Sequence, residues 1–333
     1  MTNNKQRDIW IDTLRGIAAL GVMIAHLAVT FPNIGVKGSG TGKLFVSLFL
    51  CITGYYSFAG NNEKDWKAKG ILSFYGKKVR IIIPQFLFCL LIGWGLELYN
   101  LNDVWKTLTF QMGLKHFWYI PVVLGLYLIV PFISMMVTPF QKSMRVYVFA
   151  ILIIGFEIVF PWFRSTENTI EFWWYISPML IGSFIRELVD RDFKKSIVYD
   201  VGTMVCVLVL IIIVPGVREL VFNIPSDGYL QNKLVFMSLI WGSIIFCISK
   251  SKYIYKLINK PNILSRGAKY GYTLYLIHCL ILDKLRMSGI YEWRLVLYTI
   301  VLSSVAAVII YYMIQYPIDY MIKRIEKDGK RYV

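Results

Sequence analysis

The stretch RDIWIDTLRGIAALGVMIAH, residues 7–26, predicts how the rest of the chain is organised. It is apolar enough for a membrane span, yet it carries Asp8, Asp12, Arg15 and His26. Each of these side chains is costly in hydrocarbon unless it is paired or faces a wet cavity. At about 100° per residue they return to nearly one helix face, and about 1.5 Å of rise per residue separates Arg15 from His26 by about 16 Å. We therefore predict a polar stripe that runs from the membrane edge into its depth.

The composition of the chain is typical of an integral membrane protein. Of its 333 residues, 57% are hydrophobic and 16% aromatic, and the mean hydropathy is +0.57. Soluble domains are nearer about 45–50% apolar. The formal net charge of +16 is scattered between apolar runs, so no nucleic-acid partner is expected. The five cysteines lie in apolar runs without the spacing of metal ligands, which predicts neither disulfides nor a metal site.

Ten apolar runs predict membrane helices. They cover residues 9–30, 42–59, 81–98, 117–137, 146–163, 171–186, 199–217, 234–249, 271–288 and 295–317. Most of the 36 lysines and arginines fall in alternate connections, which by the positive-inside rule places both termini in the cytoplasm. We predict an all-α, multi-pass protein of the inner (plasma) membrane. It would form a single bundle of about ten transmembrane helices that is one domain over residues 1–333.

Three residues of the first predicted span are candidate catalytic groups. The reference pKa of histidine is ~6.5, so His26 can take a proton from a hydroxyl near neutral pH, as a general base must. Arg15 is permanently cationic and suits a phosphate or a developing oxyanion, and Asp12 can hold or neutralise its guanidinium. These groups permit acyl transfer to an alcohol across a membrane. They equally permit a proton-coupled transporter, or an exporter of glycans or lipids that does no chemistry.

Lys77, Lys78 and Arg80 concentrate positive charge just before the third predicted span. One interpretation is that they set the topology and attract anionic lipid. The other is that they receive a phosphorylated cytoplasmic substrate, because a guanidinium binds phosphate through two hydrogen bonds.

Five further residues are candidates for binding a substrate. His116 and Tyr119 belong either to an interfacial aromatic belt or to the border of an outward cavity, where aromatic faces suit sugar rings. Glu157 is a carboxylate within a predicted span and is therefore a functional-site candidate. His278 lies in the middle of the ninth span with Tyr275 about one turn earlier, and it serves either packing or the reaction directly.

Several segments together resemble the acyltransferase-3 family of membrane acyltransferases. The run IDTLRGIAALGVMIAH, residues 11–26, is similar to the opening motif of that family, in which an arginine and a histidine are separated by ten residues. The other similar segments are CITGYYSF (51–58), KKVRIIIP (77–84), HFWYIPVVLGLYLIVPFI (116–133) and GYTLYLIH (271–278). The chain departs from the family at QYP, residues 315–317, where a glutamate-arginine-proline run is common.

The resemblance implies an enzyme of ten helices that takes an acyl group, usually acetyl, from cytoplasmic acetyl-CoA. The acceptors would be hydroxyls of an extracytoplasmic envelope polysaccharide or a lipid-linked sugar. His26 would be the catalytic base or an acyl relay, Arg15 its cationic partner, and Arg80 a contact for the phosphates of the donor. Membrane lipid is the other expected partner, and the sequence leaves self-association open.

Overall fold

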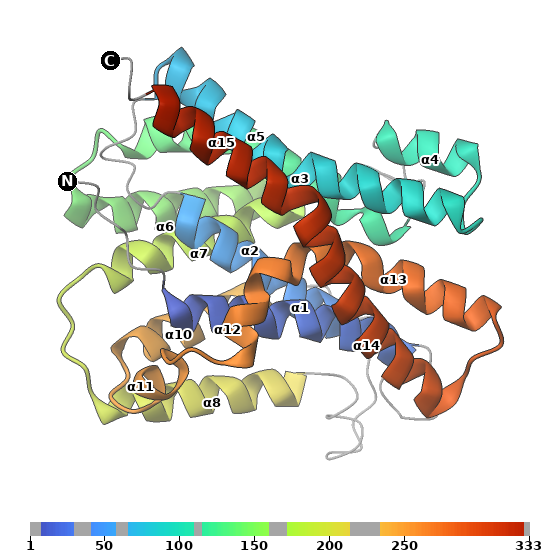
Figure 1. The fold of residues 1–333 in the computed structure, drawn as a ribbon. Coiled ribbons are helices and arrows are strands. Elements are labelled where there is room, and N and C mark those ends of the chain that lie inside the picture. The colour runs from blue at the N-terminus through green and yellow to red at the C-terminus, as the bar shows by residue number, and fades with distance from the viewer. Residues whose placement is uncertain are drawn as a thin grey trace. The chain divides into compact units, whose positions relative to one another are not determined.

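The computed structural model describes residues 8–29, 41–57, 66–109, 115–159, 172–213 and 234–329, and the elements in these ranges are all helices. They divide into two compact units, each of which is described by itself (Figure 1). The first unit comprises Met1–Lys64, Ile129–Glu167 and Glu171–Lys269, and the second comprises Asp65–Leu128, Asn168–Ile170 and Tyr270–Val333. That the whole chain is one domain stays a prediction.

The first unit contains most of the predicted apolar runs. Its helices are α1 (Ile9–Val29), α2 (Thr41–Ser57), α6 (Lys142–Val159), η5 (Phe172–Tyr175), α7 (Ile176–Val189), α8 (Ile197–Ile213), α10 (Leu234–Lys250), α11 (Ile254–Ile258) and α12 (Ile263–Gly267). A short 3-10 helix, η6 (Ala268–Tyr270), follows α12. Helix α5 (Tyr119–Val137) begins in the second unit and ends in the first.

The second unit contains α3 (Ala68–Gly95), α4 (Leu101–Leu108), η3 (Lys115–Phe117), α13 (Gly271–Met287), α14 (Glu292–Ile310) and α15 (Tyr316–Gly329). Helices α14 and α15 are joined without a break by η7, a π-helical turn over Tyr311–Gln315. Helix α3 begins well before the predicted span 81–98, so Lys77, Lys78 and Arg80 lie on a helix rather than in a loop. The apolar run alone did not reveal this, because it marks only the apolar part of the helix. Lysine and arginine are good helix formers, and they extend the helix beyond that part.

The all-α membrane class is confirmed. Within the described residues, each of the ten predicted apolar runs overlaps a helix. Among the described residues, four helices are long and apolar enough to cross a membrane: Ile9–Ala28, Ala68–Gly95, Tyr119–Val137 and Glu292–Ile325. The number of ten transmembrane helices and the cytoplasmic position of both termini stay predictions.

Helix α1 lies in the core of the first unit, although it carries charged residues. Trp10, Ile11 and Leu14 are at most 3% exposed and belong to an apolar cluster that also includes side chains of α2, α7 and α10. The indole of Trp241 on α10 donates a hydrogen bond to the backbone oxygen of Leu44 on α2 (2.8 Å). Helix α1 itself contacts α2, α11 and α12, and these contacts fix the direction of its polar stripe.

A buried amide links three helices of the second unit. Gln85 of α3, which is 2% exposed, donates to the side-chain oxygen of Gln315 (3.0 Å) and accepts from the hydroxyl of Thr273 on α13. Gln315 in turn donates to Asp319 (2.9 Å). Pro84 removes one backbone donor from α3 at this level, and the hydroxyl of Tyr272 donates to the backbone oxygen of Ile82 (3.0 Å). Hydrogen bonding satisfies these buried groups and ties α3, α13 and the π-helical turn together.

Candidate active site

The polar stripe of α1 contains an ion pair. Nη1 of Arg15 lies 3.0 Å from Oδ1 of Asp12, one turn earlier on the helix. Asp12 is 3% exposed, whereas the side chain of Arg15 is 37% exposed. Since a buried carboxylate needs a partner, the pair stabilises the charge of Asp12 and fixes the guanidinium. Asp12 therefore contacts the guanidinium of Arg15, and the side chain of Arg15 stays partly exposed.

Helix α2 contributes a tyrosine to this stripe. The hydroxyl of Tyr56 donates to Oδ2 of Asp8 (3.2 Å), and the guanidinium carbon of Arg15 lies 4.7 Å from the centre of the Tyr56 ring. The neighbouring Tyr55 holds a second arginine, because the guanidinium carbon of Arg186 on α7 lies 4.9 Å from its ring. Two arginines therefore lie against adjacent tyrosine rings, a favourable arrangement for cations that have lost part of their water.

His26 lies in the last turn of α1 and is partly buried. His26 is eleven positions after Arg15, with ten residues between them, and both belong to one continuous α-helix. The helical rise keeps the two side chains about 16 Å apart along the axis. A single small group thus cannot touch both side chains at once. Any substrate that uses both must be long, with different chemical groups at its two ends.

The second unit brings together three of the predicted substrate-binding residues. Nε2 of His116 lies 2.9 Å from the hydroxyl of Tyr99, and the hydroxyl of Tyr275 donates to the backbone oxygen of His116 (2.5 Å). The rings of Tyr119 and Tyr275 meet edge to face with centroids 5.5 Å apart. Helices η3, α5 and α13 therefore form an aromatic cluster with an imidazole at its centre. Tyr119 and Tyr275 are at most 9% exposed, so these contacts chiefly fix the positions of the rings and of the imidazole.

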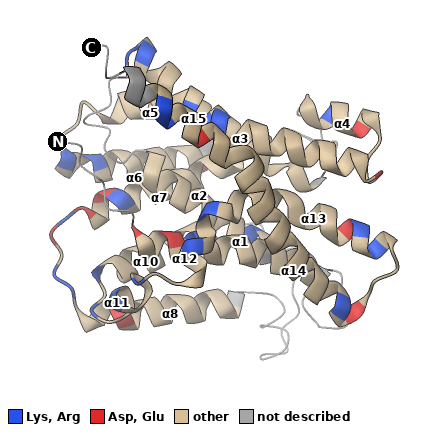
Figure 2. Ribbon diagram, in the orientation of Figure 1, with Lys and Arg blue, Asp and Glu red and all other residues tan. Residues whose placement is uncertain are grey.

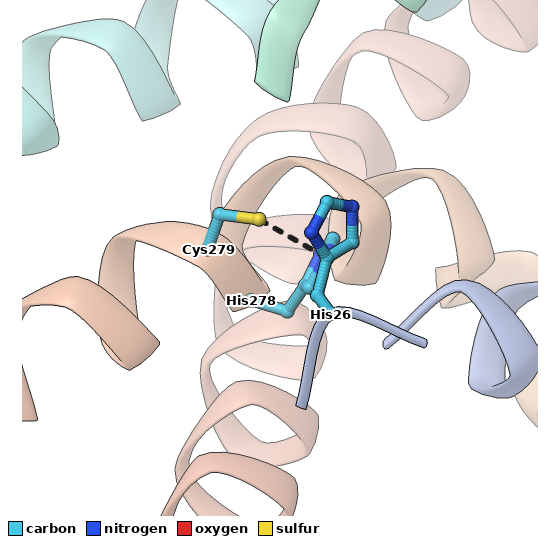
Figure 3. A group of neighbouring side chains, drawn as sticks. All are labelled: His26, His278 and Cys279. Atoms are coloured by element: carbon cyan, nitrogen blue, oxygen red, sulfur yellow. Dashed lines mark hydrogen bonds between the residues drawn. The ribbon is translucent and has the colours of Figure 1, made fainter. Parts of the chain in front are cut away.

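His278 is buried in the middle of α13, with 1% exposure. Its Nδ1 lies 3.0 Å from the backbone oxygen of Leu274, and its Nε2 lies 3.3 Å from Sγ of Cys279 (Figure 3). The ring of Tyr275 is 6.1 Å away. The side chain is thus held within its own helix and adjoins the aromatic cluster through Tyr275.

The three predicted phosphate contacts on α3 differ in their surroundings. The ammonium of Lys78 lies 4.1 Å from the centre of the Tyr127 ring and 5.4 Å from that of Phe74. Lys77 is exposed and Arg80 is partly exposed. The ammonium of Lys78 is held against these two rings by cation–π contacts. Lys77 and Arg80 are therefore better suited to bind an anion.

Glu157 lies apart from the other candidates. It is exposed near the end of α6, and no hydrogen bond or ion pair joins it to a described residue. Within the part of the chain that the structure describes, Glu157 therefore has no polar partner with which to form a site.

Three residues with tertiary contacts were not predicted from the sequence: Tyr56, Arg186 and Gln85. Tyr56 lies within CITGYYSF, but a tyrosine in an apolar run gives no sign of which helix it will meet. Arg186 is the last residue of the sixth predicted span, so it counted only as a topology signal. Gln85 is an uncharged polar residue inside an apolar run, and burial alone reveals that its amide needs partners.

Comparison with known proteins gives one match. A family model described as an acyltransferase domain, Acyl_transf_3, matches residues 8–315. No curated protein and no solved structure matches the chain. The matched region contains the stripe of α1, the basic residues of α3 and the aromatic cluster.

Proposed function

Because the chain belongs to the acyltransferase-3 family of membrane acyltransferases, we propose that it is an O-acetyltransferase. It transfers acetyl from cytoplasmic acetyl-CoA to hydroxyls of an extracytoplasmic envelope polysaccharide or lipid-linked sugar. The observation that carries the proposal is the pairing of Arg15 with Asp12 on the helix that also bears His26. The family match supplies the reaction class, and these residues supply the groups that the reaction requires.

The separation between Arg15 and His26 suits the shape of the donor. Coenzyme A carries its phosphates at one end and its thioester at the end of a long pantetheine arm. Arg15, fixed by Asp12 and Tyr56, is placed to bind the phosphates or the polar part of that arm. His26 then meets the thioester, about 16 Å further along α1. The two residues act on different parts of one long substrate.

The transfer itself needs one proton acceptor. His26 removes the proton from the acceptor hydroxyl as its oxygen bonds to the thioester carbonyl carbon. The carbon–sulfur bond then breaks, and coenzyme A leaves with a proton as the free thiol. In a relay, the imidazole nitrogen takes the acetyl first and passes it to the hydroxyl in a second step.

Thiol release by the purified protein tests the proposal. With acetyl-CoA and a polysaccharide or lipid-linked sugar, we expect free thiol and O-acetyl ester to appear in equal amounts. Thiol is measured with a disulfide reagent and ester by mass spectrometry of the glycan. Flux of glycan across vesicles without thiol release would instead indicate an exporter and contradict the proposal.

Arg80 is expected to contribute to donor binding. Replacing it by glutamine removes a charge-assisted contact worth about 1.5–3 kcal/mol, so the KM for acetyl-CoA should rise about 10- to 100-fold while the KM for the acceptor stays unchanged. Steady-state kinetics with each substrate varied in turn measure this. Lys78→Gln should have a smaller effect, since the Lys78 cation already lies on Tyr127. Lys106→Gln, in the exposed helix α4, is the control. An unaltered donor KM in Arg80→Gln would remove its role.

A further inference from the structure

Residues 250–267, which include α11 and α12, form a compact feature of the first unit that we call the basic lobe. Its cationic residues are Lys250, Lys252, Lys256, Lys260 and Arg266, and it contains no aspartate or glutamate. Figure 2 shows this concentration of basic residues around α11 and in the segment that leads into α8. The charge of the basic lobe therefore has one sign.

The basic lobe is anchored firmly to the rest of its unit. The carboxylate of Asp200, in the first turn of α8, accepts hydrogen bonds from the backbone nitrogens of Lys252 (2.9 Å) and Ile254 (2.8 Å). The side chain of Asn262 donates to the hydroxyl of Thr13 on α1 (2.9 Å). Close packing adds to this, because a Cβ on Gly16 would lie 2.5 Å from the backbone oxygen of Leu264. These contacts make the basic lobe a fixed surface.

The basic lobe lies where several apolar helices begin or end. Helix α10 ends at Lys250, whose ammonium donates to the backbone oxygens of Val189 (2.8 Å) and Arg191 (2.7 Å) just beyond α7. The backbone nitrogen of Ser196, just before α8, donates to the oxygen of Lys250 (3.1 Å). Apolar helix ends mark the boundary between hydrocarbon and headgroups. The basic lobe is thus at headgroup level.

The outward face of the basic lobe combines apolar and cationic side chains. Leu257 is 72% exposed and Ile263 is 86% exposed, while Ile254 and Ile258 of the same short helices pack onto the core. Four cations lie between or beside the exposed apolar groups and are exposed themselves: Lys252, Lys256, Lys260 and Arg266. None of the four forms an ion pair with a described residue. Leucine and isoleucine so exposed are unfavourable in water, but the mixture is typical of a surface embedded among lipid headgroups.

The segment before α8 extends this surface. The ammonium of Lys195 lies 3.4 Å from the centre of the Tyr255 ring on α11, and Lys194 next to it is exposed. Desolvation and the neighbouring ammonium groups of Lys256 and Lys250 lower the pKa of Lys195. A bound anion would reduce the electrostatic repulsion among these ammonium groups.

We propose that the basic lobe binds the headgroups of anionic phospholipids in one leaflet. Its lysines and Arg266 contact the phosphates, while Leu257 and Ile263 enter the upper part of the acyl chains. Charge complementarity favours an anionic lipid over a zwitterionic one, because residues 250–267 include no carboxylate to meet a choline group. The proposal does not depend on the transfer reaction, since lipid binding can be measured without turnover.

The test is lipid binding by the full-length protein in an uncharged detergent. Native mass spectrometry during titration with phosphatidylglycerol, and separately with phosphatidylcholine, gives a dissociation constant for each lipid. The wild type should prefer phosphatidylglycerol. Combined Lys252→Gln, Lys256→Gln and Lys260→Gln should weaken its binding by roughly 100-fold, since each charge near an anionic surface contributes about a factor of five. The double variant Leu257→Gln with Ile263→Gln should weaken the binding of both phosphatidylglycerol and phosphatidylcholine.

The matched control removes three exposed cations of the second unit, through Lys106→Gln, Arg286→Gln and Arg294→Gln. It should retain the preference for phosphatidylglycerol. An equal loss in this control, or wild-type binding in the lobe variant, would overturn the proposal. A competition experiment adds coenzyme A or inorganic phosphate to the lipid-bound protein. It tests whether the basic lobe binds a soluble phosphate compound instead of a lipid headgroup. If coenzyme A displaces the lipid and the lobe variant raises the donor KM, the occupant is the soluble donor and the lipid proposal is wrong.

Discussion

His26→Ala is expected to lower the turnover number for acetyl transfer by about 10²- to 10⁴-fold, the range that a general base contributes. Alanine leaves α1 helical but removes the nitrogen that accepts the proton of the acceptor. The donor should still bind, because Arg15, Asp12 and Tyr56 are untouched at the other end of the stripe. Turnover is measured by thiol release at saturating acetyl-CoA, and donor affinity by equilibrium binding.

Two measurements separate chemistry from folding in that variant. Its melting temperature in detergent should stay close to that of the wild type, and added imidazole should restore part of the rate. A folded His26→Ala protein with wild-type turnover would remove the catalytic role. To distinguish base from relay, the wild type is mixed with acetyl-CoA and no acceptor. A relay releases one thiol per protein molecule in a burst, whereas a base releases none.

Gly54→Ala should unfold or severely destabilise the first unit. A Cβ on Gly54 would lie 1.8 Å from the backbone oxygen of Met179, and one on Gly182 would lie 1.9 Å from that of Cys51. Helices α2 and α7 thus approach through reciprocal glycines, with the hydroxyl of Ser183 donating to the oxygen of Gly54 (3.2 Å). Separating the backbones costs about 3 kcal/mol or more, at the upper end for overpacking.

Thermal unfolding in detergent checks this expectation. The control is Gly155→Ala in α6, where an added Cβ would meet nothing within 4 Å. Alanine there should leave the melting temperature unchanged or raise it slightly, because alanine favours helix more than glycine does. A melting temperature of Gly54→Ala equal to that of Gly155→Ala would contradict the packing of α2 on α7. Because Tyr55 and Tyr56 follow Gly54 directly, the variant should also disturb the contacts of Arg15 and Arg186.

The sequence was a good guide to helices and a weaker guide to helix ends. Apolar runs predict helices because every backbone group must be satisfied in lipid, and in the part of the chain that the structure describes each predicted run overlaps a helix. The start of α3 was missed, because a helix continues into the headgroup region wherever its residues favour it. That difference placed Lys77, Lys78 and Arg80 on a helix, where the rotation of about 100° per residue turns Lys78 away from the other two and toward Phe74 and Tyr127.

The sequence by itself determined an all-helical membrane protein, and it determined that Asp12 and Arg15 would meet. Residues one turn apart on a helix are neighbours whatever the rest of the chain does. The tertiary structure alone decided that Tyr56 would close the stripe of α1, that Tyr99 and Tyr275 would hold His116, and that Gln85 would join three helices. These contacts join residues far apart in the chain. Which helices meet depends on how well their surfaces pack, and no local periodicity records that.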